Sequence, residues 1–229
     1  MPRNIMIVLA GANLLLSCDD APKNHMVNQK INVSAPADVE VRDEHSETIH
    51  EGLVRVNLDS LGFINDMVYA TQNNFTRQQI YPCPECYLRD EVARALLQAN
   101  QLAQKQKLRI IIYDCFRPIS LQQKMYDLVQ NPDYVAHPKN GSKHNRGCAV
   151  DVGLADFDGK PLNMGTQFDD FSENAHYINT RPNSQERKNR KILRDLMLEA
   201  KFLPYEKEWW HFNFNRTDFP TSNFQWNCN

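Results

Sequence analysis

The sequence carries no excess of charge of either sign. Its 229 residues include 26 Lys and Arg against 28 Asp and Glu, which gives a formal net charge of −2. Nucleic-acid-binding surfaces are usually strongly basic, so we expect no nucleic-acid partner. The chain also lacks internal repeats, a GxGxxG motif and a P-loop, so it has no nucleotide-binding fingerprint. A chain of this length with 41% hydrophobic residues is expected to form one domain.

The sequence also lacks a predicted membrane-spanning segment, because its longest apolar run is too short to cross a bilayer. Residues 5–16 are almost wholly apolar and follow Arg3, whereas a spanning helix needs about 20 residues. The run fits the hydrophobic part of a secretory signal. Leu15, Ser17 and Cys18 resemble a bacterial lipobox, which implies cleavage before Cys18 and acylation of its thiol. The alternative is a plain signal peptide with a chance cysteine.

The chain therefore divides into three predicted regions. Residues 1–18 are predicted to be a lipoprotein signal peptide, and residues 19–52 are polar without periodicity, as in a flexible tether. Residues 53–229 are predicted to form the folded domain. Together these features predict an exported protein of the cell envelope, anchored to a membrane through its N-terminal lipid and facing the periplasm.

Cysteine is scarce, and its spacing argues against a zinc knuckle. Cys83 and Cys86 form a CxxC motif, but no second CxxC exists to complete a knuckle. The strand-then-helix context of a thioredoxin is also absent, which disfavours redox catalysis. Five cysteines remain after Cys18, so at least one thiol of an exported protein stays unpaired. We interpret these cysteines as structural, bridged or not.

Helical and extended patterns alternate along the domain without regular βαβ spacing. Apolar residues at helical spacing predict a helix over residues 90–106, another capped by Ser120, and a third opened by Ser184. β-Branched or aromatic runs predict strands over residues 108–114, 148–154 and 209–214. This pattern predicts an α+β fold with a mostly antiparallel central sheet flanked by helices.

Two histidines and an aspartate are spaced as candidate zinc ligands. Catalytic zinc takes three protein ligands and keeps one position open, and His144, Asp151 and His211 supply such a set. Asp151 should share a strand face with the small Ala149, which leaves room for a metal. Lone histidines are more often hydrogen-bonded structural residues, and spacing alone leaves that alternative open.

Charged residues near these positions suit peptide hydrolysis. Glu208 stands three residues before His211, so in a regular strand the two would face opposite sides. We therefore expect Glu208 in a bend that enters the strand, from which it would reach the attacking water as a general base. Arg117 follows a hydrophobic strand and is a candidate to stabilise the oxyanion, with Asp114 orienting its guanidinium.

The motifs of the domain, in their order along the chain, resemble those of the zinc D-alanyl-D-alanine dipeptidases, the enzymes known from vancomycin resistance. The two most specific are SxHxxGxAxD at residues 142–151 and EWWH at residues 208–211. The other matching segments are YAT (69–71), NFT (74–76), DCFRP (114–118), MGTQFD (164–169), NR (189–190) and LR (193–194). Cys148 departs from the family's usual small residue, and Phe116 from its frequent Tyr.

The resemblance implies roles for individual residues. His144, Asp151 and His211 would bind one zinc ion, Glu208 would be the general base, and Arg117 would stabilise the transition state. Ser142 would contact the charged end of the substrate. The implied fold is the α+β fold shared with D,D-carboxypeptidases and the hedgehog signalling domain.

The implied activity is zinc-dependent hydrolysis of D-Ala-D-Ala to two D-alanines in cell-wall peptide metabolism. One alternative is a D,D- or L,D-carboxypeptidase that trims longer peptidoglycan stem peptides. The other alternative is not an enzyme: a non-catalytic lipoprotein that binds peptidoglycan or a protein partner.

Overall fold

The computed structural model describes residues 50–131, 135–179 and 181–228. The predicted signal peptide, Cys18 and nearly all of the predicted tether lie outside these residues, so the division of the chain into three regions stays a prediction. Within the described residues, no helix is long and apolar enough to cross a bilayer.

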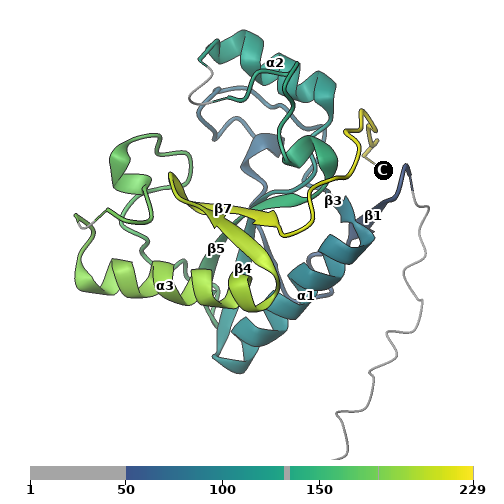
Figure 1. The fold of residues 1–229 in the computed structure, drawn as a ribbon. Coiled ribbons are helices and arrows are strands. Elements are labelled where there is room, and N and C mark those ends of the chain that lie inside the picture. The colour runs from purple at the N-terminus through teal and green to yellow at the C-terminus, as the bar shows by residue number, and fades with distance from the viewer. Residues whose placement is uncertain (1–49, 132–134, 180, 229) are drawn as a thin grey trace, which may run out of the picture. The chain divides into compact units, whose positions relative to one another are not determined.

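A five-stranded sheet forms the centre of the domain (Figure 1). Its strand order is β2-β4-β5-β7-β6, and every neighbouring pair is antiparallel except β2 and β4. The strands are β2 (Ile64–Asn65), β4 (Leu108–Asp114), β5 (Ala149–Asp156), β7 (Glu208–Phe214) and β6 (Phe202–Tyr205). A separate antiparallel pair joins β1 (Leu53–Val56) to β3 (Cys86–Arg89). The predicted α+β class with a mostly antiparallel sheet is confirmed.

Three α-helices accompany the sheet in the described part of the chain. The helix α1 (Asp90–Lys105) packs against β4, and α3 (Ser184–Glu199) packs against β6 and α1. Figure 1 shows α1 and α3 along the same side of the sheet and α2 (Ile119–Val129) away from them. Short 3₁₀ turns occupy Val68–Ala70 (η1), His144–Arg146 (η2) and Glu173–Ala175 (η3).

One predicted helix cap is wrong. Ser120 is the second residue of α2, and Pro118 occupies the capping position without a side-chain hydrogen bond. Proline needs no N–H partner at a helix start and has a fixed φ, so it begins the helix earlier than a serine cap would. By contrast, α3 does open at Ser184, and Asn183 caps it in a reciprocal capping box with Glu186.

The central strand β5 is buried along almost its whole length. Residues 149–155 are all buried, including the polar Asp151, because both faces of this strand are covered. The expectation of a roomier face at Ala149 therefore understates the burial. A carboxylate this deep in the domain requires partners that stabilise its charge.

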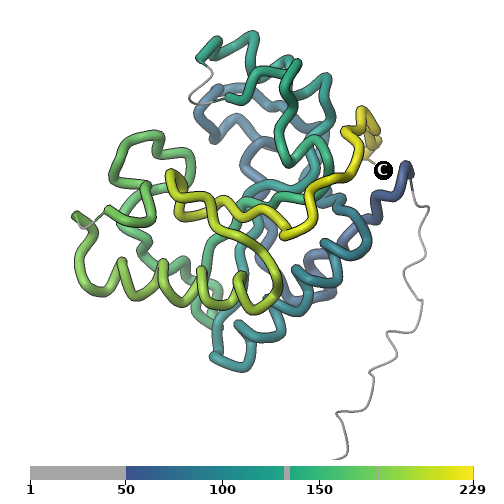
Figure 2. Tube along the Cα trace, in the orientation of Figure 1, coloured from purple at the N-terminus to yellow at the C-terminus, as the bar shows by residue number. Residues whose placement is uncertain are grey.

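Two disulfides join segments that are distant in sequence. Cys83 pairs with Cys228, and Cys86 pairs with Cys115, so the two cysteines of the CxxC motif do not bridge each other. Cys148 is free and buried, which agrees with the expected odd thiol. Figure 2 shows the segment after β7 running back towards the beginning of the domain, where the Ser222 hydroxyl donates a hydrogen bond to Glu51.

Candidate metal centre

The three predicted zinc ligands converge at one point. Asp151 on β5 and His211 on β7 are direct partners in the antiparallel register, and His144 comes from the turn η2 just before β5. His144 Nε2 lies 3.2 Å from His211 Nδ1 and 3.4 Å from Asp151 Oδ1, and the latter two atoms are 2.9 Å apart. Gly147, with a φ of +67°, reverses the chain between the turn and the strand.

Hydrogen bonds on the far sides of the imidazoles fix which nitrogens face that point. His144 Nδ1 donates to the carbonyl oxygen of Cys115 at 2.7 Å, because a carbonyl only accepts. His211 Nε2 donates to Asn213 Oδ1 at 3.1 Å. In the neutral imidazoles, His144 Nε2 and His211 Nδ1 therefore carry the lone pairs, which are directed towards the same place as a carboxylate oxygen.

This donor set fits zinc. Zinc–ligand bonds of about 2.0–2.2 Å in a tetrahedron place neighbouring ligand atoms about 3.3–3.6 Å apart. The separations here are 2.9–3.4 Å. Three electron-pair donors this close repel one another unless a cation or a shared proton lies between them, and two histidines with one carboxylate are typical ligands of catalytic zinc.

The pKa values of the proposed ligands show that the buried carboxylate of Asp151 attracts positive charge. Burial acts to lower the pKa of His211, but its hydrogen bond to Asp151 and the charge of that carboxylate outweigh burial and raise the pKa to about 9. Burial acts to raise the pKa of Asp151, and the charges and hydrogen bonds of His144 and His211 overcome it and lower that pKa. Asp151 therefore stays ionised inside the domain, ready to bind a positive charge.

Glu208 lies beside the ligands but outside the set. It is the first residue of β7 rather than part of a preceding bend, and its Oε2 is 3.9 Å from His211 Nδ1. The pairing of β6 with β7 shifts register between Pro204 and Tyr205, which pairs Tyr205 with Glu208. Because this end of the ladder is irregular, Glu208 reaches the same side as His211 despite the three-residue spacing. Burial raises the pKa of Glu208.

Arg117 is held rigidly by buried partners. Its guanidinium contacts the carboxylate of Asp114 through Nη2, donates from Nη1 to Gln122 Oε1 at 2.9 Å, and donates from Nε to the Tyr81 hydroxyl at 3.3 Å. Tyr81 in turn donates to Asp114 at 2.6 Å. These contacts use three of the five N–H donors of an arginine, so donors remain for an oxyanion. The expected contact between Asp114 and Arg117 is present.

All six predicted site residues of the domain line one pocket of about 300 Å³. They are Arg117, Ser142, His144, Asp151, Glu208 and His211. Ser142 is half-buried, and its hydroxyl accepts a hydrogen bond from the backbone N–H of His144 at 3.3 Å. The structure thus brings together side chains that are separated by up to about a hundred positions in the sequence.

Sequence reasoning gave no site role to Tyr69 and Asp169, which also line this pocket. The buried Tyr69 donates its hydroxyl to both carboxylate oxygens of Asp169, at 3.1 and 2.9 Å. Burial, and then the nearby charge of Asp151, raise the pKa of Asp169 well above its ordinary value. The signal was present, because both residues lie in segments that carry the family resemblance, YAT and MGTQFD.

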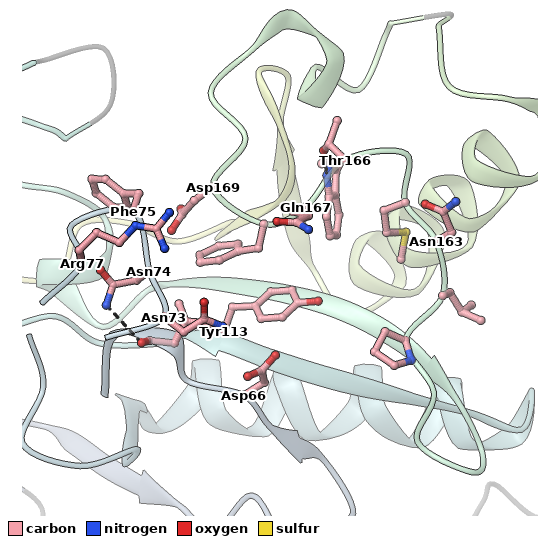
Figure 3. Close-up of a pocket in the computed structure, with 16 residues that line it drawn as sticks. Asp66, Asn73, Asn74, Phe75, Arg77, Tyr113, Asn163, Thr166, Gln167 and Asp169 are labelled. Atoms are coloured by element: carbon pink, nitrogen blue, oxygen red, sulfur yellow. Dashed lines mark hydrogen bonds between the residues drawn. The ribbon is translucent and has the colours of Figure 1, made fainter. Parts of the chain in front are cut away.

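A second, larger cleft adjoins this pocket. It has a volume of about 670 Å³, and Phe75 and Asp169 line both cavities. Figure 3 shows Phe75, Asp169 and Arg77 at one end of the cleft and Asn163 at the other. Asp169 therefore forms part of the boundary between the two cavities.

Comparison with known proteins identifies the family of the chain. A family model described as D-ala-D-ala dipeptidase matches residues 51–227. The chain belongs to this family. A D-alanyl-D-alanine dipeptidase of Escherichia coli is 32% identical over 164 residues, which cover 71% of this chain and 85% of the relative. One from Enterococcus faecium is 28% identical over 180 residues, 69% and 89% of the two chains. The protein is accordingly a metallopeptidase of the dipeptidase type.

Solved structures show weaker similarity. A vancomycin-resistance D,D-pentapeptidase VanY in complex with Zn(II) has a TM-score of 0.39 and 14% identity, over 58% of this chain and 75% of that chain. The D,D-dipeptidase VanXYg in complex with a D-Ala-D-Ala phosphinate analog has a TM-score of 0.38 and 18% identity, over 71% and 66%. Similarity at this level does not bear on function, and the family assignment rests on the sequence matches.

Proposed function

We propose that this protein hydrolyses the dipeptide D-Ala-D-Ala to two D-alanines with one zinc ion, in cell-wall peptide metabolism. The observation that carries the proposal is the convergence of His144 Nε2, His211 Nδ1 and Asp151 Oδ1 at 2.9–3.4 Å within a small pocket. Membership of the D-ala-D-ala dipeptidase family supports the same substrate.

The residues around the ligands divide the chemistry of hydrolysis. When bound, zinc acts as a Lewis acid that polarises the scissile carbonyl and makes a water molecule acidic enough to attack near neutral pH. Glu208 takes the proton of the attacking water and passes it to the leaving amine. Arg117, fixed by Asp114, donates to the oxyanion with little reorganisation.

Further groups in the pocket suit the two charged ends of a dipeptide. Burial raises the pKa of Asp169, which the Tyr69 hydroxyl holds, and the positive charge of the substrate ammonium group would favour the ionised carboxylate and bind to it. The Ser142 hydroxyl already accepts from the backbone, so its hydrogen is available to the substrate carboxylate. Recognition of both termini would restrict the pocket to dipeptides.

We also propose that the protein is an exported lipoprotein, with acylated Cys18 anchoring the domain to a membrane in the cell envelope. The lipobox-like sequence before Cys18 supports this anchor. The two disulfides support an oxidising compartment, because such bonds are rare in the cytosol. Labelled fatty acid should be incorporated into the wild-type chain in cells and lost in Cys18→Ala; labelling of both would contradict the anchor.

Hydrolysis of longer peptides is a second candidate function, favoured by one observation. The cleft of about 670 Å³ adjoins the pocket at Asp169, where the amino end of the dipeptide is proposed to bind, and would have space for preceding residues. In that case a pentapeptide ending in D-Ala-D-Ala would be cleaved faster than the free dipeptide.

Comparison of three substrates tests both functions. We expect free D-Ala-D-Ala to be cleaved with the highest kcat/KM, N-acetyl-D-Ala-D-Ala much more slowly because its ammonium charge is gone, and the pentapeptide more slowly still. Faster cleavage of the pentapeptide would favour the carboxypeptidase, and no cleavage of any substrate would favour a non-catalytic binding protein.

A further inference from the structure

The disulfide between Cys86 and Cys115 includes a residue that contacts a proposed zinc ligand, because the Cys115 carbonyl accepts a hydrogen bond from His144. Cys86 begins β3, and Cys115 is the first residue after β4. Both are fully buried, and neither lines the pocket. The bond therefore has no place in the proposed reaction itself.

The residues after β4 are joined to the turn that carries His144 by three hydrogen bonds. His144 Nδ1 donates to the Cys115 carbonyl at 2.7 Å. The backbone N–H of Arg117 donates to the His144 carbonyl at 3.1 Å, and Asn145 Nδ2 donates to the Arg117 carbonyl at 2.7 Å. The first of these bonds sets the orientation and the tautomer of the imidazole.

The strand β3 contacts both of these segments. The N–H of Phe116 donates to the Tyr87 carbonyl at 3.0 Å, and the N–H of Arg89 donates to the Gly147 carbonyl at 3.0 Å. Among the described residues, the disulfide is the one covalent cross-link in this arrangement. It ties the carbonyl that orients His144 to the strand that also contacts the end of the His144 turn.

We propose that the Cys86–Cys115 disulfide is a positioning element for the zinc ligand His144. It fixes the Cys115 carbonyl, which holds the imidazole with Nε2 towards the metal. The inference rests on the proposed zinc function. Outer hydrogen-bond partners of metal-ligating histidines contribute about 10–100-fold to metal affinity or activity. Because the disulfide acts through such a partner, its loss should weaken zinc binding about tenfold, at the lower end of that range.

The second disulfide provides a matched control. Cys83–Cys228 links positions 145 residues apart, against 29 for Cys86–Cys115, so chain entropy predicts that it contributes at least as much to stability. In the described structure, His144 Nδ1 bonds to the Cys115 carbonyl, whereas the Cys83 carbonyl accepts from Trp226 Nε1 at 3.4 Å. If the disulfides acted only through stability, removing either one would lower zinc affinity. If Cys86–Cys115 positions His144, only its removal should lower zinc affinity.

The experiment measures zinc affinity, by competition with a chelator, in purified full-length protein well below the melting temperature. We expect Cys86→Ala/Cys115→Ala to bind zinc about tenfold more weakly than the wild type. We expect Cys83→Ala/Cys228→Ala to bind with wild-type affinity despite an equal or greater fall in Tm. Activity is then measured at saturating zinc, where the first variant should recover most of its kcat.

Several results would overturn the inference. Equal zinc affinity of the first variant and the wild type would do so, as would equal losses in both double variants. If the double substitution prevents folding, Cys86→Ala breaks the same bridge while leaving Cys115 in place, and the same comparison applies. A wild type that binds no zinc would instead refute the proposed function.

Discussion

Two halves of the pocket are built in different ways. The ligand half consists of His144, Asp151 and His211, two of which are register partners on adjacent strands. The arginine half is Arg117, which lines the pocket, together with Asp114 and Tyr81, which lie outside the lining and hold Arg117 at the end of β4 through buried side-chain hydrogen bonds. The difference teaches that backbone register positions two of the proposed zinc ligands, whereas a side-chain network positions the arginine that we propose to stabilise the transition state. Variants of the first half should change zinc binding, and variants of the second half should change rate.

The largest effect is expected in the ligand half. His144→Ala removes one of three ligands, so zinc affinity should fall by more than the ~100-fold that loss of an outer partner costs. Hydrolysis of D-Ala-D-Ala should fall to background with it. Metal analysis after gel filtration checks this, with Lys143→Ala as a neighbouring control that should retain zinc. Full zinc occupancy in His144→Ala would remove His144 from the ligand set.

Glu208 lies beside the proposed ligands without belonging to them, so its substitution should separate the rate of hydrolysis from zinc binding. Glu208→Gln keeps the side-chain shape but removes the base, so kcat should fall about 10²–10⁴-fold while zinc remains stoichiometric. Steady-state kinetics and metal analysis on the same sample separate the two quantities. A variant that keeps its rate would assign the base to another residue.

Arg117→Lys tests the arginine half. A lysine is a point charge and cannot contact Asp114, Gln122 and the Tyr81 hydroxyl while also donating to the oxyanion. We expect kcat to fall about 10²–10³-fold with zinc affinity unchanged. If zinc affinity fell instead, the two halves would not be separable.

Tyr81→Phe should have a smaller effect of the same kind. It removes the hydroxyl that donates to Asp114 at 2.6 Å and accepts from Arg117, which leaves a buried carboxylate one hydrogen bond short. A loss of about 1–1.5 kcal/mol corresponds to roughly a tenfold lower kcat. Zinc affinity should stay at the wild-type value, and an unchanged kcat would show that Asp114 alone positions Arg117.

The last prediction concerns the stability of the fold rather than the activity, and it involves the buried thiol of Cys148. Burial raises the pKa of Cys148 from 9.0 to about 11. Between these values the thiol ionises in the unfolded chain but not in the folded one, so stability should fall as pH rises from 9 to 11, by about 2–3 kcal/mol at most. Urea denaturation should show this slope reduced in Cys148→Ala; identical slopes would contradict it.

Much of the fold and of the site could be predicted from the sequence because the signals were local or motif-based. Helical periodicity located α1 and α3, and β-branched runs located β4 and β5. The spacing of His144 and Asp151 around Gly147 indicated two ligands of one site. The exact register that pairs Asp151 with His211 came only from the structure.

The rest depends on contacts between distant segments. Tyr81 carries no sequence signal for its role, because it meets Asp114 from a loop 33 positions away. The pairing of Cys86 with Cys115 was equally hidden, since five cysteines allow many pairings. Glu208 was expected in a bend, but a register shift inside the β6–β7 ladder places it near His211. Tertiary packing decided each of these features.

The central claim is that His144, Asp151 and His211 hold one zinc ion that supports hydrolysis of D-Ala-D-Ala. The most direct measurement is zinc content together with D-alanine release, on wild-type protein before and after chelation and zinc restoration. The account predicts one zinc per chain, loss of activity on chelation, and recovery with one equivalent of zinc. Full D-alanine release by chelated protein, or a wild type that binds no zinc, would contradict it.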